Sequence, residues 1–110
     1  MWQGLSLTMI SKLKQVLAEW IAEGYIEGEL TLEPEWYVLW QPDELEEINQ
    51  DYQLCEFAPE FITFGGNGGG ELLVINDKEE VFYIPTICMS PKAAIKIANN
   101  LKTFKQSMSK

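Results

Sequence analysis

The sequence predicts an α+β domain in which helices pack on an antiparallel or mixed sheet. Apolar residues recur at helical spacing over residues 7–22, and β-type runs follow between residues 25 and 85. A second helical pattern begins after Pro91. Helices and strands are therefore grouped along the chain, which is typical of α+β folds and not of alternating βαβ units. With 110 residues, the chain has the length of a single domain, 1–110.

The first helix is predicted over residues 7–22. Its apolar positions fall at steps of three and four: Ile10, Leu13, Leu17 and Trp20. Ser6 is a candidate N-cap, and Gly24 is placed to end the helix. The apolar stripe is wide and needs cover on more than one side. This predicts either that residues 1–10 fold over it or that the chain forms a homodimer through this N-terminal helix.

Residues 25–40 are predicted to be extended. Leu30 and Leu32 alternate with polar residues as in a half-buried strand, and Pro34 interrupts the pattern. Residues 36–40 favour a second strand because they are aromatic or branched. Farther along, three more strands are predicted at 61–64, 71–75 and 80–84, with a hairpin turn at 76–79 between the last two.

Two further helices are predicted from their start signals. Pro42 fits the first turn of a short helix, whose apolar residues are Leu45 and Ile48. Ser90 and Pro91 fit a cap and a first turn. The helix after them would place these residues on one face: Ala94, Ile97, Ala98, Leu101 and Phe104. Asn100 is a candidate cap for a separate second half of that helix.

The composition excludes several classes of function. The net charge is −9, and the chain contains no His and no Arg. Without His there is no general base near neutral pH, and neither a catalytic residue, a metal ligand set nor a cofactor site is evident. A chain this acidic repels nucleic acid and suits a basic protein partner. Two distant cysteines, no apolar run of 18 residues and no basic N-terminal region predict a cytoplasmic protein with reduced, mostly buried thiols and no membrane segment.

The glycine-rich segment between two predicted strands is the most unusual feature. Its glycines are Gly65, Gly66, Gly68, Gly69 and Gly70. A dinucleotide-binding motif needs glycine where Glu71 stands, and a P-loop needs Gly-Lys-Ser/Thr, which is absent. Both motifs also need a helix next, whereas residues 71–75 have a strand pattern. The segment is therefore predicted to be a tight structural loop that binds no phosphate.

Acidic residues are segregated along the chain. All 17 of them lie between residues 15 and 80, where Lys78 is the single cation. Eight carboxylates fall within 21 residues and form the candidate partner-binding site: Glu27, Glu29, Glu33, Glu35, Asp43, Glu44, Glu46 and Glu47. The first four alternate, so in a regular strand they would share one side, with Pro34 a possible break. Because such clustering costs stability, a binding role is favoured over a merely solubilising surface.

Several motifs in a fixed order resemble the SUKH superfamily, which contains fungal cell-wall assembly regulators and many bacterial toxin-immunity proteins. The central one is the strand end Phe64-Gly65, the Gly-rich turn, and Glu71 followed by an apolar strand. The others are Glu23-Gly24-Tyr25-Ile26, Leu39-Trp40, Pro42-Asp43-Glu44-Leu45, Asn49, Ile84-Pro85, Cys88-Met89 and residues 101–104. The match covers residues 13–108. The family usually has a further helix first, followed by a Leu-Pro pair and a Tyr. Here the corresponding stretch is Ser11-Lys12-Leu13-Lys14, with no Pro and no Tyr, so the first family helix is missing or shortened.

The resemblance implies an α+β fold and a binding function without catalysis. It favours an immunity-type protein that neutralises a toxin domain, often a nuclease. A regulatory or scaffold domain that binds a host protein is the second hypothesis. A small enzyme that uses carboxylates, for example Glu71 with Asp77, is a distant third.

Overall fold

The structure is a computed structural model that describes the backbone of residues 4–110 and the side chains of residues 8–110. The elements are α1 (Gly4–Ala22), β1 (Glu27–Glu29), β2 (Trp36–Leu39), the 3₁₀ turn η1 (Pro42–Glu44), α2 (Leu45–Asp51), α3 (Leu54–Phe57), β3 (Ile62–Gly66), β4 (Glu71–Ile75), β5 (Val81–Pro85), the 3₁₀ turn η2 (Pro91–Ala93), β6 (Ile95–Ala98) and α4 (Leu101–Gln106). The predicted α+β class is confirmed.

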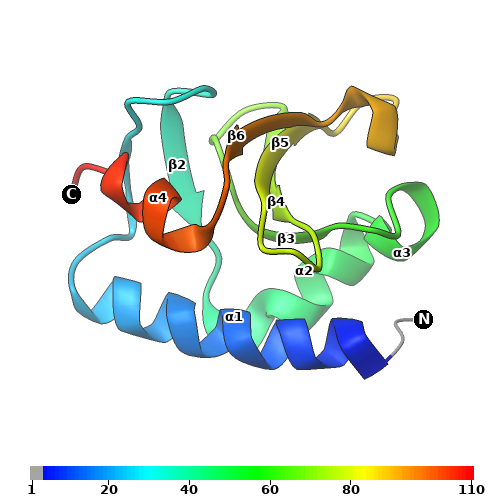
Figure 1. The fold of residues 1–110 in the computed structure, drawn as a ribbon, viewed down its shortest axis with the longest axis horizontal. Coiled ribbons are helices and arrows are strands. Elements are labelled where there is room, and N and C mark those ends of the chain that lie inside the picture. The colour runs from blue at the N-terminus through cyan, green and yellow to red at the C-terminus, as the bar shows by residue number, and fades with distance from the viewer. Residues whose placement is uncertain (1–3) are drawn as a thin grey trace.

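The six strands lie in chain order across one sheet, and every neighbouring pair is antiparallel. The sheet curls, so that the chain after β6 forms α4 and then returns to lie beside β1 (Figure 1). There Met108 forms an antiparallel bridge with Leu30, and the Ser109 amide donates to the Glu29 carbonyl at 2.9 Å. The C-terminal segment therefore covers the outer edge of β1, which would otherwise present unpaired backbone groups.

Helix α1 packs along the sheet (Figure 1). Its large buried side chains are Met9, Ile10, Leu13, Leu17 and Trp20. The helix ends in a Schellman motif, in which the Tyr25 amide donates to the Trp20 carbonyl and the Gly24 amide donates to the Ile21 carbonyl, both at 3.0 Å. Gly24 has a φ of 104°, which side chains rarely tolerate, so the predicted stop is confirmed.

The start and the outer face of α1 differ from the sequence prediction. The helix begins at Gly4, so Ser6 lies inside it and is not its N-cap. Among the side chains described for α1, no large apolar one is exposed, and Val16 and Ile21 pack partly buried against the core. Residues 1–3 and the side chains up to residue 7, on which the predicted fold-back depends, lie outside the described part. No helix among the described residues combines the length and hydrophobicity needed to cross a membrane.

Helix α4 fills the opening between β6 and the first two strands (Figure 1). Its predicted cap is confirmed, because Asn100 Oδ1 accepts a hydrogen bond from the Thr103 amide at 2.8 Å. Phe104 is fully buried; its ring stacks near Trp20 and meets Phe64 edge-on, with centroids 6.3 and 5.4 Å apart. Two aromatic contacts thus fix α4 against both α1 and the sheet.

The sheet has a hydrophobic core on each face. On β4, Leu73 and Ile75 belong to the core under α1 and α4, whereas Leu72 and Val74 belong to a smaller core under α3 and η2. This explains why the strand is apolar throughout instead of alternating. The smaller core lies over β3 to β5 and reaches Trp40 just after β2. Over β1 and β2 the same face is only partly covered: Val38 is half-buried and Trp36 is 38% exposed.

The helix predicted after Pro91 is wrong over residues 95–98, which form strand β6. Its residues pair with β5, for example Ile95 with Tyr83 and Ala98 with Val81. The segment Ile-Lys-Ile-Ala is compatible with the residue spacing of a helix and with that of a strand. The unpaired edge of β5 offers backbone hydrogen bonds that stabilise the strand. Only η2 and α4 remain helical, and the Ser90 side chain makes no capping bond.

A buried polar network joins α2 to the sheet. Asn49 Nδ2 donates to the Leu45 carbonyl at 2.8 Å and to the Thr63 carbonyl at 3.0 Å, and Asn49 Oδ1 accepts from the Thr63 amide at 2.8 Å. Thr63 Oγ1 in turn accepts from Trp40 Nε1 at 3.0 Å. Strand β2 pairs with β3 only at Gly65 and Gly66. Beyond the end of β2, the Asn49 side chain therefore provides the hydrogen bonds that the backbone of β3 at Thr63 would otherwise lack.

Candidate protein-binding surface

The first two predicted carboxylates lie on an exposed strand face. Glu27 and Glu29 flank the buried Gly28 on β1, and they stand opposite Val38 and Trp36 of β2. Directly opposite residues in an antiparallel pair have Cβ atoms about 4.5–5.5 Å apart and share a face. Trp36 and two carboxylates therefore form one continuous surface.

The predicted alternation does not continue beyond Glu29. Glu33 and Glu35 lie in the connection between β1 and β2, where both are exposed. The Glu35 amide donates to the Leu32 carbonyl at 2.8 Å, and the Leu30 amide donates to the Glu35 carbonyl at 2.9 Å. The chain is turning here, and Glu35 adopts a left-handed φ of 76°. The four glutamates thus share one end of the sheet, but they do not share the side of one strand.

The other four carboxylates lie on η1 and α2, where all four are exposed. Pro42 occupies the first turn of η1, as predicted. Asp43 and Glu44 follow it, and Glu46 and Glu47 lie in the first turn of α2. Carboxylates at these positions stabilise a helix start, so they also have a local structural role. Glu46 forms an ion pair with Lys14 of α1.

The structure divides the eight carboxylates into two groups. Glu33 and Glu35 precede β2, whereas Asp43 and Glu44 follow it. A four-residue strand is about 13 Å long, so the two groups lie at opposite ends of β2. Within the described residues, ion pairs engage Glu46 alone among the eight. Seven uncompensated carboxylates therefore face solvent.

The glycine-rich segment is shorter as a loop than the sequence predicted. Gly65 and Gly66 belong to β3, where a Cβ on Gly65 would lie 2.7 Å from the Val38 carbonyl oxygen. The strands approach so closely that no side chain fits there. In the loop itself, Gly68 has a φ of 75°, which favours glycine, whereas a Cβ on Gly70 would meet nothing within 4 Å.

The turns at the two ends of β4 share a motif that sequence reasoning missed. In the first, Asn67 Oδ1 accepts from the amides of Gly69 and Glu71 at 3.0 and 3.1 Å, and Asn67 Nδ2 donates to Glu71 Oε1 at 2.8 Å. These amides are occupied and a carboxylate stands beside them, which disfavours phosphate at this loop. The repeated signal was Asn-x-x-x-Glu, at residues 67–71 and 76–80.

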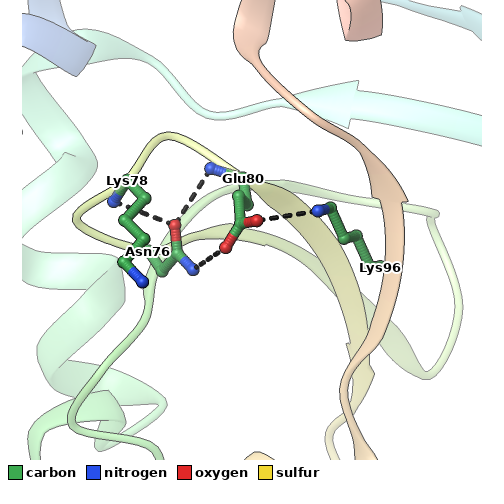
Figure 2. Close-up of polar contacts among 4 residues, drawn as sticks. All are labelled: Asn76, Lys78, Glu80 and Lys96. Carbon is green, nitrogen blue, oxygen red and sulfur yellow. Dashed lines mark hydrogen bonds and ion pairs between the residues drawn. The ribbon is translucent and has the colours of Figure 1, made fainter.

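Figure 2 shows the second turn. Asn76 Oδ1 accepts from the amides of Lys78 and Glu80 at 3.0 and 2.9 Å, and Asn76 Nδ2 donates to Glu80 Oε1 at 2.8 Å. Lys96 of β6 donates to Glu80 Oε2 at 2.7 Å. The hydrogen bonds from Lys96 and from Asn76 lower the pKa of Glu80 below its ordinary value. The turn thereby links the β4–β5 hairpin to β6.

Other candidate groups are not brought together. Glu71 is the first residue of β4 and Asp77 lies past its other end, so the carboxylate pair considered for an enzyme does not converge. No group of three His, Cys, Asp or Glu side chains among the described residues is arranged to hold a metal ion. Cys55 is half-buried and Cys88 is exposed with a φ of 58°, so the prediction of buried thiols is wrong for Cys88.

Comparisons with protein-family models and with curated proteins found no match to this chain.

Proposed function

We propose that this chain is a non-enzymatic protein-binding domain of the SUKH type that acts as an immunity protein. In this role it binds a basic toxin domain, such as a nuclease, and blocks it. The observation that carries the proposal is a set of seven exposed carboxylates that make no ion pair with any described residue, on a chain of net charge −9. A nuclease site attracts polyanions, and a surface of this charge competes for it.

The motif residues behind the resemblance support the proposal because the fold depends on several of them. Gly24 ends α1 with a left-handed φ, Asn49 bonds the backbone of β3, and Gly65 permits close strand contact. These are the positions at which a shared fold would demand the same residue types. The observed sheet with packed helices also agrees with the architecture that the resemblance implies.

Complementary charge is expected to act mainly on the rate of association. Steering by opposite charges raises association rate constants by about 10- to 1,000-fold at low salt. Rapid capture suits an inhibitor that must reach a toxin before the toxin reaches its substrate. A cytoplasmic location is part of the proposal, because a nuclease toxin acts inside the cell.

Co-expression with the toxic domain of a neighbouring toxin gene tests the proposal. We expect this chain to restore growth and to form a stable complex with that domain during size-exclusion chromatography. Growth arrest that persists although both proteins are folded and present would contradict an immunity role. A gene neighbourhood without a toxin would favour the regulatory alternative, in which the same acidic surface binds a host protein.

A homodimer through α1 is a separate proposal. The described face of α1 that points to solvent carries small or polar side chains: Ser11, Lys12, Gln15, Ala18, Glu19 and Ala22. The described part of α1 therefore offers no large exposed apolar side chain to such a dimer. Sedimentation velocity at high protein concentration decides it, and a single monomeric species would remove the proposal.

A further inference from the structure

The open sheet face over β1 and β2 combines an aromatic side chain with acidic ones. Trp36 is 38% exposed although it lies in a strand, and Glu29 stands directly across from it. One step along, Glu27 stands across from the half-buried Val38. We call these four residues the Trp36 face. Trp is among the residues that contribute most to protein–protein binding energy when a partner covers them.

The rest of the molecule leaves this face accessible while closing the neighbouring edge. The C-terminal segment bridges β1 through Leu30 and Met108, so a partner cannot add a strand there. The lysines that approach β1 do not neutralise the face. Lys105 and Lys110 lie over the ring of Tyr25, at 5.6 and 5.0 Å from its centroid, and Tyr25 packs against the core on the opposite face of the sheet.

The glycine-rich loop borders the Trp36 ring. A Cβ on Gly68 would lie 3.8 Å from Trp36 Cδ1 and 3.9 Å from Val38 Cγ2. The φ of residue 68 favours glycine, and a Cβ on Gly69 or Gly70 would make only ordinary contacts or none. The loop therefore borders one edge of the Trp36 ring at Gly68, and the exposed part of the ring remains for a partner.

We infer that the Trp36 face docks an arginine side chain of a basic protein partner. The guanidinium stacks on the Trp36 indole and donates hydrogen bonds to the Glu29 carboxylate, and Glu27 adds attraction. Arginine suits this arrangement because its planar cation stacks on aromatic rings and pairs with carboxylates in a bidentate manner. The class of partner rests on the proposed function, whereas the recognition of arginine rests on the geometry of this face.

NMR titration with a short peptide tests the inference without a cognate partner. The probe is acetyl-Gly-Arg-Gly-Arg-Gly-amide at low salt, and the control probe has citrulline in place of arginine. We expect the Trp36 indole N–H and the amides of residues 27–29 and 66–68 to shift with the arginine peptide alone. Trp36→Ala and the double variant Glu27→Gln/Glu29→Gln should each weaken binding by about threefold to fivefold.

The matched control is the double variant Glu56→Gln/Glu60→Gln, which removes the same charge from exposed residues outside the eight candidate carboxylates. When the titrations are repeated at about 150 mM salt, where the Debye length is about 8 Å, this control should change the affinity by less than about twofold, because charges beyond that length are largely screened. Circular dichroism confirms that each variant is folded. If Trp36→Ala does not fold, the Glu27→Gln/Glu29→Gln variant still tests the inference. Shifts that spread over all acidic segments, or an unchanged affinity of Trp36→Ala and of the Glu27→Gln/Glu29→Gln pair, would overturn the inference.

The toxin complex separates this inference from the proposed function. If the toxin domain is neutralised equally well by wild type and by Trp36→Ala, the immunity role stands and the Trp36 face is not its docking site. If no toxin is neutralised but the arginine peptide maps to the Trp36 face, the inference stands and the immunity role fails.

Discussion

Replacing Asn49 with alanine removes the side chain that completes the edge of β3. In the structure, Asn49 serves the amide and the carbonyl of Thr63 at 2.8 and 3.0 Å, inside a site where both residues are fully buried. A buried polar group left without a partner costs about 1–3 kcal/mol. Two such groups, partly relieved by water that enters the space, predict a loss of about 2–4 kcal/mol. For a chain of this length that corresponds to a fall of roughly 8–17 °C in Tm.

Equilibrium unfolding in urea measures this loss, with intrinsic tryptophan fluorescence as the signal. Gln50→Ala is the matched control, because Gln50 is exposed on the same helix, and its free energy of unfolding should change by less than about 0.5 kcal/mol. A loss below about 1 kcal/mol for Asn49→Ala, with an unchanged m-value, would refute the role of Asn49 as a partner for the β3 backbone.

Three further results are expected. Gly65→Ala should destabilise the protein by about 2 kcal/mol or more in thermal melts, since its Cβ would lie 2.7 Å from a backbone oxygen. Gly70→Ala is the control and should be nearly neutral; equal effects of the two substitutions would contradict the close strand contact. Because the pKa of Glu80 is lowered in the fold, its contribution is present above the unfolded pKa and is lost as pH falls through the folded pKa. Urea midpoints below pH 4.5 should therefore fall less steeply in Glu80→Gln than in wild type, and parallel profiles would disprove the link to Lys96. ATP or NAD should leave the Tm unchanged, and a rise would show that the glycine-rich loop binds nucleotide.

The sequence predicted those helix ends and strands that are determined by residues next to them in the chain. Gly24 and Asn100 act through the backbone next to them, and both end or begin a helix as predicted. The strand over residues 71–75 was predicted with its observed limits, since an apolar run between two turns leaves little choice. Chain turns set by Asn, Gly and Pro are similarly recognisable.

Long-range pairing determined what the sequence could not predict. Residues 95–98 became β6 because the edge of β5 was free, which no pattern within four residues reveals. Gly65 and Gly66 joined β3 because β2 lies close beside them. The path of the chain at Leu32 and Pro34 likewise turns back to pair β1 with β2.

The candidate surface was predictable in composition but not in shape. Acidic segregation was visible in the sequence, yet the separation of the carboxylates by β2 depends on strand length and direction. Trp36 was assigned to a strand by its residue type, and its exposure follows from α3 and η2 covering only the far part of that sheet face.

The central claim is that the acidic surface captures a basic partner. It is tested most directly by measuring, with stopped-flow fluorescence, the rate constant at which this protein associates with the toxic domain encoded by a neighbouring toxin gene. Between about 20 and 300 mM salt the Debye length falls from roughly 20 to 6 Å, and the rate constant should fall at least about tenfold. In Glu27→Gln/Glu29→Gln the low-salt rate should drop and the salt dependence should become shallower, whereas the dissociation rate should change less. An association rate constant that ignores both salt and these substitutions would contradict the acidic surface as the site of partner capture.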